Sequence, residues 1–361
     1  MSGRKKIVLS IGMIFKNEKR CLERCLKSLQ LLRAALPCEL VMADTGSDDG
    51  SREVAEKYAD VFFDFPWTGD FSAARNAVMD RCSGKWFFSL DADEWLDEDI
   101  SQLVSFLKDN KITEEAAGLT VRNYLFPENP ACTDFVAVRM LRLSSGLRYQ
   151  GRIHEYWAHE DGSTLCVRLL KNVVLHHDGY VMLNDGSVEG QEKLKRNRQL
   201  LKKELEERPE DLKLIVQCIE SCGSDWNAQL PYIRQGLALL PEKKKDEAVY
   251  GANLLRYAVH ASCKLGMPEF PEWLALAEEL FPNSMYTMVD IQFDAAEHAW
   301  REMNCPELIC RGKRYISGVK NYRAGRLFNV NEMLQSPLRY AGLCSETTLR
   351  IYVARAQIYE G

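Results

Sequence analysis

Hydrophobic and polar positions divide the chain into two parts with different periods. From Lys6 to about Leu90, short apolar runs alternate with longer stretches in which apolar residues recur every three or four positions. Short apolar runs predict buried strands, and the periodic stretches predict helices that connect parallel strands. The first part of the chain is therefore predicted to be an α/β domain with a mixed, mainly parallel sheet.

The pattern places strands and helices alternately before residue 91. Strands are expected at 7–14, 39–43, 61–63 and 86–90, with helices at 17–36, 51–58 and 71–79. Asn17 is expected to cap the first helix, and Ser47 or Asp48 the second. A further helix is expected over 96–107, with one of the preceding acids at its N-cap.

Beyond about Gly186 the periodic pattern is helical throughout. Proline-marked breaks occur at 208–211, 240–242, 281–283 and 336–337, and the first three recur at spacings of roughly 30 to 40 residues. This spacing predicts helix-pair repeats of the tetratricopeptide kind, with an irregular helical bundle as the alternative. We place the predicted domains at residues 1–185 and 186–361.

Composition narrows the class of protein. The 361 residues suffice for two domains, and the hydrophobic fraction of 46% is ordinary for a globular protein. A net charge of -5 offers no field for nucleic acid, and no apolar run approaches the ~20 residues that a membrane helix needs. The start of the chain does not resemble a signal peptide. We expect a cytoplasmic protein with no transmembrane segment and no nucleic-acid partner.

Twelve cysteines are scattered without a CxxC pair. We interpret them as reduced, mostly buried thiols. Cys21 and Cys25, like Cys218 and Cys222, are four residues apart and could hold a metal on one helix face, although core packing is the favoured interpretation.

Two acidic clusters directly follow predicted strands. Asp44-Thr-Gly-Ser-Asp-Asp-Gly50 follows the second, and Asp91-Ala-Asp-Glu94 follows the fourth. Crowded carboxylates are costly unless positive charge shares the site. In open parallel sheets, ligands bind outside the carboxyl ends of the strands. If the backbone is extended, Asp91 and Asp93 point the same way, about 6 to 7 Å apart, so both could face one cation or diphosphate.

The cluster at 44–50 has two interpretations. It is a plain turn between a strand and a helix, or it offers a helix N-terminus and an aspartate to a base or ribose. The patterns GxGxxG and GxxxxGK[ST] are absent from it, so the usual dinucleotide and phosphate-loop sites are excluded there.

Six short motifs occur in an order that resembles family 2 glycosyltransferases of the GT-A fold. They are Ile14-Phe-Lys-Asn-Glu18, Ala43 to Gly50, Asp70-Phe-Ser-Ala-Ala-Arg-Asn76, Leu90 to Glu94, Gly151-Arg-Ile-His-Glu155 and His177-Asp-Gly-Tyr180. With Lys195-Arg-Asn-Arg-Gln199 and the helical second part, the chain resembles the bacterial subgroup that carries tetratricopeptide-like repeats. That subgroup includes peptide and protein glycosyltransferases.

The resemblance implies a metal-dependent donor site. Asp91, Ala92 and Asp93 match the family's DXD motif, in which Asp93 would bind Mn²⁺ or Mg²⁺ and Asp91 would face the ribose or the metal's waters. His177 would be a further metal ligand or phosphate contact, with His176 as a competing neighbour. One acid could instead be a helix cap.

The resemblance also places the nucleotide. Phe15, Lys16 and Asn17 would border the uridine, although Phe15 could simply belong to the core. Asp44 would contact the base or ribose. Arg75 matches a family arginine near the diphosphate, to which a fixed guanidinium fork is suited. The alternative for Arg75 is a plain surface or helix-dipole role.

Inversion at the anomeric carbon requires a base for the acceptor, and Glu155 is the first candidate with His154 second. His154 could instead orient the acceptor, and the whole motif could be a charged strand end. Residues 124–139, with Tyr149, Tyr156 and Trp157, are expected to form an acceptor-side loop and aromatic surface, or ordinary core.

These features predict an inverting glycosyltransferase that moves a hexose or N-acetylhexosamine from a UDP-sugar donor to a peptide, protein or glycan acceptor. The helical domain would select the acceptor and could pair subunits into a homo-oligomer. The alternative is a catalytically weak, nucleotide-binding scaffold whose helical repeats bind a protein partner. A nucleotidyltransferase also uses paired carboxylates and metal, but the motifs at 151–155 and 177–180 count against it.

Overall fold

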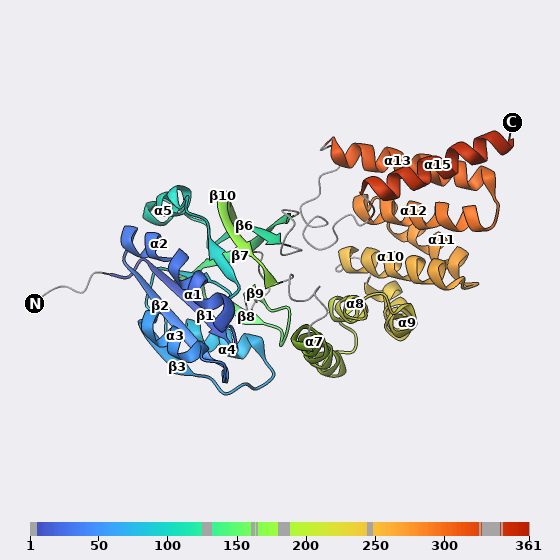
Figure 1. Cartoon of the computed structure of the whole chain (residues 1–361). Coiled ribbons are helices and arrows are strands. Elements are labelled where there is room, and N and C mark those ends of the chain that lie inside the picture. The colour runs from blue at the N-terminus through green and yellow to red at the C-terminus, as the bar shows by residue number, and fades with distance from the viewer. Residues whose placement is uncertain are drawn as a thin grey trace, which may run out of the picture. The chain divides into compact units, whose positions relative to one another are not determined.

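The computed structural model describes residues 6–124, 132–159, 163, 165–179, 188–243, 248–324, 326, 340 and 342–360. Contacts divide the chain into two compact units, Met1–Leu200 and Leu201–Gly361 (Figure 1). The predicted change from an α/β architecture to helices alone is confirmed.

The first unit is built on an eight-stranded mixed sheet of order β3-β2-β1-β4-β7-β6-β10-β5. The strands are β1 (Leu9–Phe15), β2 (Cys38–Asp44), β3 (Val61–Asp64), β4 (Trp86–Ser89), β5 (Glu94–Leu96), β6 (Ala116–Tyr124), β7 (Cys132–Arg142) and β10 (Val167–His177). The first four strands are mutually parallel, as are β6 and β10, whereas β7 and β5 run antiparallel to their neighbours. A small separate sheet pairs β8 (Arg148–Gln150) with β9 (Tyr156–Ala158).

Helices cover both faces of the large sheet because side chains alternate along each strand. In β1, Leu9, Ile11 and Met13 join the cluster that includes residues of α1 (Lys19–Ser28), α2 (Gln30–Ala35), α3 (Ser51–Tyr58) and α5 (Ser101–Lys108). Ile14 instead joins the cluster of α4 (Phe71–Met79). Because β1 pairs in parallel with β2 and with β4, the carboxyl ends of these three strands lie at one edge of the sheet. Figure 1 shows the first unit with its sheet and covering helices.

The start of the first predicted helix is corrected by the structure. The N-cap position of α1 is Glu18, not Asn17, and the predicted single helix is divided into α1 and α2. Asn17 has a left-handed backbone (φ 57°) and its side-chain oxygen accepts a hydrogen bond from the Asp48 amide at 2.9 Å. Asparagine tolerates this conformation better than most residues. Asn17 therefore belongs to the loop between β1 and α1 and does not cap the helix.

Two further local predictions were wrong. The N-cap position of α3 is Gly50, with φ 92°, not Ser47 or Asp48. The predicted helix over 96–107 begins only at Ser101, because residues 94–96 form β5 and pair with β10. A strand this short depends on a partner far away in sequence, so local periodicity does not reveal it.

The second unit consists of helices that pack in sequence order. They are α8 (Leu212–Ser221), α9 (Trp226–Lys243), α10 (Ala248–Leu265), α11 (Phe270–Leu280), α12 (Met285–Arg301), α13 (Cys305–Arg323) and α15 (Leu343–Glu360), while α7 (Val188–Glu207) crosses the boundary between the units. The predicted breaks at 208–211 and 281–283 fall between helices, whereas Pro241 lies within α9 near its end. The break at 336–337 lies outside the described residues.

All twelve cysteines are free thiols, as predicted. The prediction that most are buried was wrong, because only Cys21, Cys25, Cys218 and Cys263 are buried. Cys25 packs in the main core of the first unit. Among the described helices, none is both long and apolar enough to cross a membrane.

Candidate active site

Acidic and basic side chains meet at the edge where several strands end. Asp91 follows β4, and its carboxylate accepts hydrogen bonds from Arg75 Nη2 at 2.7 Å and from Arg139 Nη1 at 3.4 Å. Burial opposes ionisation of Asp91, but the charges of Arg75 and Arg139 outweigh it and hold its pKa well below the usual range. The positive charge that the acidic cluster requires therefore comes, in part, from the protein itself.

The backbone at 91–94 turns, so the prediction of an extended segment was wrong. The amide of Glu94 donates to the carbonyl of Asp91 at 3.1 Å. Asp91 contacts the two arginines, whereas Asp93 contacts His177. Each aspartate of the motif thus has its own set of partners.

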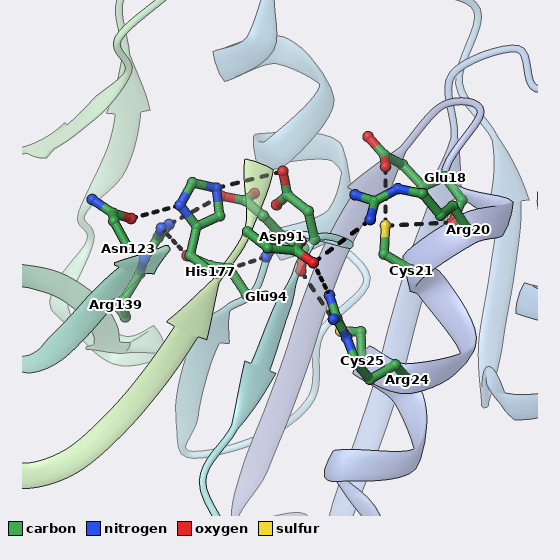
Figure 2. A network of polar contacts seen from close by, with 12 residues as sticks. Glu18, Arg20, Cys21, Arg24, Cys25, Asp91, Glu94, Asn123, Arg139 and His177 are labelled. Carbon is green, nitrogen blue, oxygen red and sulfur yellow. Dashed lines mark hydrogen bonds and ion pairs between the residues drawn. The ribbon is translucent and has the colours of Figure 1, made fainter. Parts of the chain in front are cut away.

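Glu94 anchors this turn from below. Its side chain is 1% exposed, its Oε1 atom is bonded by Arg139, and its Oε2 atom accepts from the Asp91 amide at 3.0 Å (Figure 2). Burial raises the pKa of Glu94 to about 7; the charge of Arg139 opposes this rise and the charge of Asp91 adds to it. Glu94 is buried next to the ionised Asp91, and the pKa values of the two acids lie apart, that of Glu94 raised and that of Asp91 lowered.

Asp93 and His177 bring a carboxylate oxygen and an imidazole nitrogen together. Asp93 Oδ2 lies 3.4 Å from His177 Nε2. His177 Nδ1 lies 2.6 Å from Asn123 Oδ1 (Figure 2). Burial opposes protonation of His177, but the hydrogen bond and charge of Asp93 raise its pKa overall. A Cβ atom at Gly179 would overlap Asp93 Oδ2 and lie 2.6 Å from His177 Nε2, so only a glycine fits against these two atoms.

The neighbouring histidine has different partners. His176 Nε2 lies 3.0 Å from Asp97 Oδ2, and its Nδ1 lies 2.9 Å from the hydroxyl of Tyr124. Its ring stacks on Trp95 at 5.1 Å. Of the two predicted metal-ligand candidates, His177 is therefore the one beside Asp93.

These residues fit a divalent cation. Mn²⁺ and Mg²⁺ accept a carboxylate oxygen, and Mn²⁺ also accepts an imidazole nitrogen. One or two protein ligands suffice where substrate phosphates supply others. Asp93 Oδ2 and His177 Nε2 provide that pair.

Arg75 links the acidic cluster at residues 91–94 to Glu155. Arg75 is 9% exposed, and its Nε atom donates to Glu155 Oε1 at 2.5 Å while Nη2 holds Asp91. Helix α4 also fixes the segment before Glu155: Ser72 Oγ donates to the Gly151 carbonyl at 2.5 Å, and the Phe71 amide donates to the Arg152 carbonyl at 2.9 Å. One helix thus positions two of the predicted motifs.

His154 is exposed and has a left-handed backbone with φ 52°. A histidine in this region is uncommon, and a backbone of this kind costs on the order of 1–3 kcal/mol unless surrounding structure holds it. Here the hydrogen bonds from α4 to the carbonyls of residues 151 and 152 hold the backbone directly before His154. The side chains of Glu155 and His154 therefore differ in setting, the first mostly buried against Arg75 and the second exposed.

The loops after β1 and β2 are tied together. Asp44 is 3% exposed, and its Oδ1 atom accepts from the amides of Gly46 at 3.0 Å and Ser47 at 2.8 Å. The Asn17 amide donates to Ser47 Oγ at 3.1 Å, and Lys16 beside it is exposed. The predicted nucleotide-side residues Lys16, Asn17 and Asp44 therefore lie on two joined loops.

Two predicted nucleotide contacts have buried side chains. Phe15 and Ala92 are each 4% exposed and belong to the main core. Phe15 instead contributes its backbone, since its carbonyl accepts from the Thr45 amide and hydroxyl at 3.0 Å. Any contact of these two residues with a nucleotide would come from the main chain.

The expected acceptor-side loop is corrected in part. Residues 132–139 belong to β7, and 125–131 lie outside the described residues, as does Tyr180. Tyr149 and Trp157 pack against each other with ring centroids 5.0 Å apart, so they are core-type contacts. Tyr156, at 38% exposed, is the aromatic side chain of this group that faces solvent most.

Sequence reasoning missed Arg139 and Asn123. Arg139 lies between Val138 and Met140 in an otherwise apolar stretch of β7, and a charged residue there requires a buried acid as its partner. That signal could have identified it. Asn123 has no comparable signal, because its partner on β10 is far away in sequence.

A second group of potential metal ligands lies in the helical unit. Ligand atoms of Cys263, Asp294 and Glu297 lie within 4.8 Å of one another. Glu297 already pairs with Lys264 at 2.6 Å and with Arg301 at 3.6 Å. Two cations beside the group argue against a metal, and we assign none to it.

Residues 10–152 match the sequence model of the family described as glycosyl transferase family 2. A lipopolysaccharide core biosynthesis glycosyltransferase, LpsC of Rhizobium meliloti, is 32% identical over 42% of this chain and 57% of its own length. A TPR repeat-containing protein of Synechococcus elongatus is 28% identical over 63% of this chain and 56% of its own. The glycosyltransferase SunS of Bacillus subtilis is 25% identical over 57% and 47%. The chain spans about half the length of these relatives.

Solved structures of S. aureus TarS are similar over a larger share of the chain but at low identity. The structure in complex with UDP-GlcNAc is 13% identical, covers 89% of this chain and 93% of that chain, and has a TM-score of 0.37.

Proposed function

We propose, from the match of residues 10–152 to the sequence model of glycosyl transferase family 2, that the protein is a metal-dependent inverting glycosyltransferase. It moves a hexose or N-acetylhexosamine from a UDP-sugar to a peptide, protein or glycan acceptor. The observation that carries the proposal is the convergence of Asp93 Oδ2 and His177 Nε2, which lie 3.4 Å apart.

The donor half of the reaction needs positive charge at the leaving diphosphate. A divalent cation held by Asp93 and His177 supplies it as a Lewis acid when bound. Asp91, which Arg75 and Arg139 fix and keep ionised, would face the ribose or the cation's waters. The loops that carry Lys16, Asn17 and Asp44 are joined by hydrogen bonds and would border the nucleoside.

The acceptor half needs a base on the opposite face of the sugar. In the proposed step, the acceptor oxygen forms its bond to the anomeric carbon as the bond to the diphosphate oxygen breaks. The acceptor proton moves to Glu155. Because Oε1 of Glu155 is engaged by Arg75, Oε2 is the atom that takes the proton. His154 is the alternative base.

Calorimetric titration of UDP, with Mn²⁺ and with chelator, tests the donor site. The two phosphates of UDP and the carboxylates of Asp91 and Asp93 repel each other unless a cation lies between them. The affinity for UDP should therefore require the metal. Asp93→Asn removes charge with little change of volume and should lose the metal-dependent part of the affinity. Equal affinity in the two conditions contradicts the metal-bridged site.

Glu155→Gln separates the base from donor binding. We expect UDP affinity near that of the wild type, with transfer lower by about 10² or more, the scale for loss of a positioned base. Transfer that persists at the wild-type rate assigns the base elsewhere, and His154→Gln is then the variant to measure.

A further inference from the structure

A buried amide contacts the side of His177 that faces away from Asp93. Asn123 is 7% exposed, and its Oδ1 atom lies 2.6 Å from His177 Nδ1 (Figure 2). We propose that Asn123 is a positioning residue that aims Nε2 of His177 at the cation. This inference rests on the cation site of the proposed function.

The chemistry of the two groups determines the direction of the bond. An amide oxygen only accepts, so Nδ1 must carry the ring proton. A neutral imidazole, the form that binds a metal, has one protonated nitrogen and one lone pair, and the lone pair is then on Nε2. In the protonated ring, Nε2 donates to Asp93 instead. Nε2 is the atom 3.4 Å from Asp93 Oδ2. The Asn123 hydrogen bond therefore selects the tautomer and the ring orientation that a metal ligand needs.

The sheet holds this arrangement from both sides. His177 is aligned with Asn123 of β6 in the parallel register and with Glu94 of β5 in the antiparallel register. Glu94 begins β5 directly after Asp93. The pairing of β5 with His177 therefore also fixes the backbone position of Asp93. Backbone pairing thus fixes Asn123, His177 and Asp93 relative to one another.

Packing alone does not require an amide at this position. A buried amide that lacks a partner is costly, whereas leucine fills nearly the same volume without that cost. The hydrogen bond to His177 gives the amide a partner. A purely space-filling role predicts that leucine is tolerated, and a positioning role predicts that an acceptor oxygen is required.

Mn²⁺ binding to the purified full chain, with UDP present, distinguishes these roles. Free Mn²⁺ is measured by electron paramagnetic resonance, and the ¹⁴N modulation of bound Mn²⁺ reports coordination by the histidine. Asn123→Leu should weaken Mn²⁺ about 10- to 100-fold and reduce the ¹⁴N signal, the range for loss of an outer-shell partner. Asn123→Asp keeps the acceptor and should bind at least as well as the wild type. Asn172→Leu, an exposed position on β10, is the matched control and should change nothing.

His177→Gln separates failure of this inference from failure of the proposed function. If His177→Gln binds Mn²⁺ like the wild type, the cation site itself is wrong. If His177→Gln weakens Mn²⁺ but Asn123→Leu does not, or if Asn123→Asp is as weak as Asn123→Leu, the positioning role is overturned while the cation site stands. Asn123→Ala, which leaves a small cavity, gives the same comparison if the leucine variant does not fold.

Discussion

One guanidinium joins the two acidic positions on which the account depends. Arg75 is buried and bonds Asp91 through Nη2 and Glu155 through Nε, while Arg139 shares Asp91 and holds Glu94. Buried ion pairs of this kind add little net stability, but removing one partner leaves an uncompensated charge. At the scale of single residues, the network acts mainly to fix the geometry and ionisation of the site.

Glu94 gives this network a measurable pH dependence. Its folded pKa is about 7, above the usual value of 4.5, so between these values the unfolded chain loses a proton that the folded chain retains. Ionisation then favours unfolding as pH rises. The thermal midpoint of the wild type, relative to Glu94→Gln, should fall between about pH 4.5 and 7 and stay level above.

Exposed Glu98 provides the control for that measurement. The difference between the wild type and Glu98→Gln should stay constant over the same pH range. A difference for Glu94→Gln that rises with pH, or does not change, contradicts the assignment of a raised pKa to Glu94.

At the scale of elements, the sequence pattern predicted the positions of helices more accurately than it predicted contacts between distant residues. Helices α3 and α4 have the predicted bounds, because each shows a clear apolar face between turn signals. β5 was missed, and the turn at 91–94 was read as extended, because both depend on β10 and on Arg139, which come much later in the chain. The strand-end location of the acidic motifs was predictable; their separate partners were not.

Helix α4 should control the segment that carries the proposed base. Ser72→Ala removes the hydrogen bond to the Gly151 carbonyl, which is worth about 1 kcal/mol in typical proteins. We expect faster hydrogen exchange of amides at 151–156 and slower transfer, with UDP affinity near that of the wild type. Ser105→Ala, at an exposed position of α5, should leave exchange at 151–156 unchanged. Unaltered exchange in Ser72→Ala would show that other contacts hold the segment.

At the scale of the whole molecule, the proposed donor and base residues all lie within the first unit. We propose that the helices of the second unit select the acceptor, because stacked helix pairs in repeat proteins create extended binding surfaces. A large acceptor such as a peptide, protein or long glycan would need such a surface. Pairing of subunits through these helices is part of the same proposal.

A chain that ends after Glu207, at the end of α7, separates recognition from support. We expect it to bind UDP and to hydrolyse donor slowly, while losing transfer to the acceptor of the full chain. If it is insoluble or cannot bind UDP, the helices support the catalytic unit and the acceptor argument fails.

The most direct test of the central claim is a screen of UDP-sugar hydrolysis by the full chain with Mn²⁺ or Mg²⁺, in which released UDP is measured. We expect at least one UDP-hexose or UDP-N-acetylhexosamine to release UDP when metal is present. We also expect this release to stop with chelator and in Asp93→Asn. UDP release that is the same with chelator, or in Asp93→Asn, would contradict a metal-dependent glycosyltransferase, as would no release from any UDP-sugar.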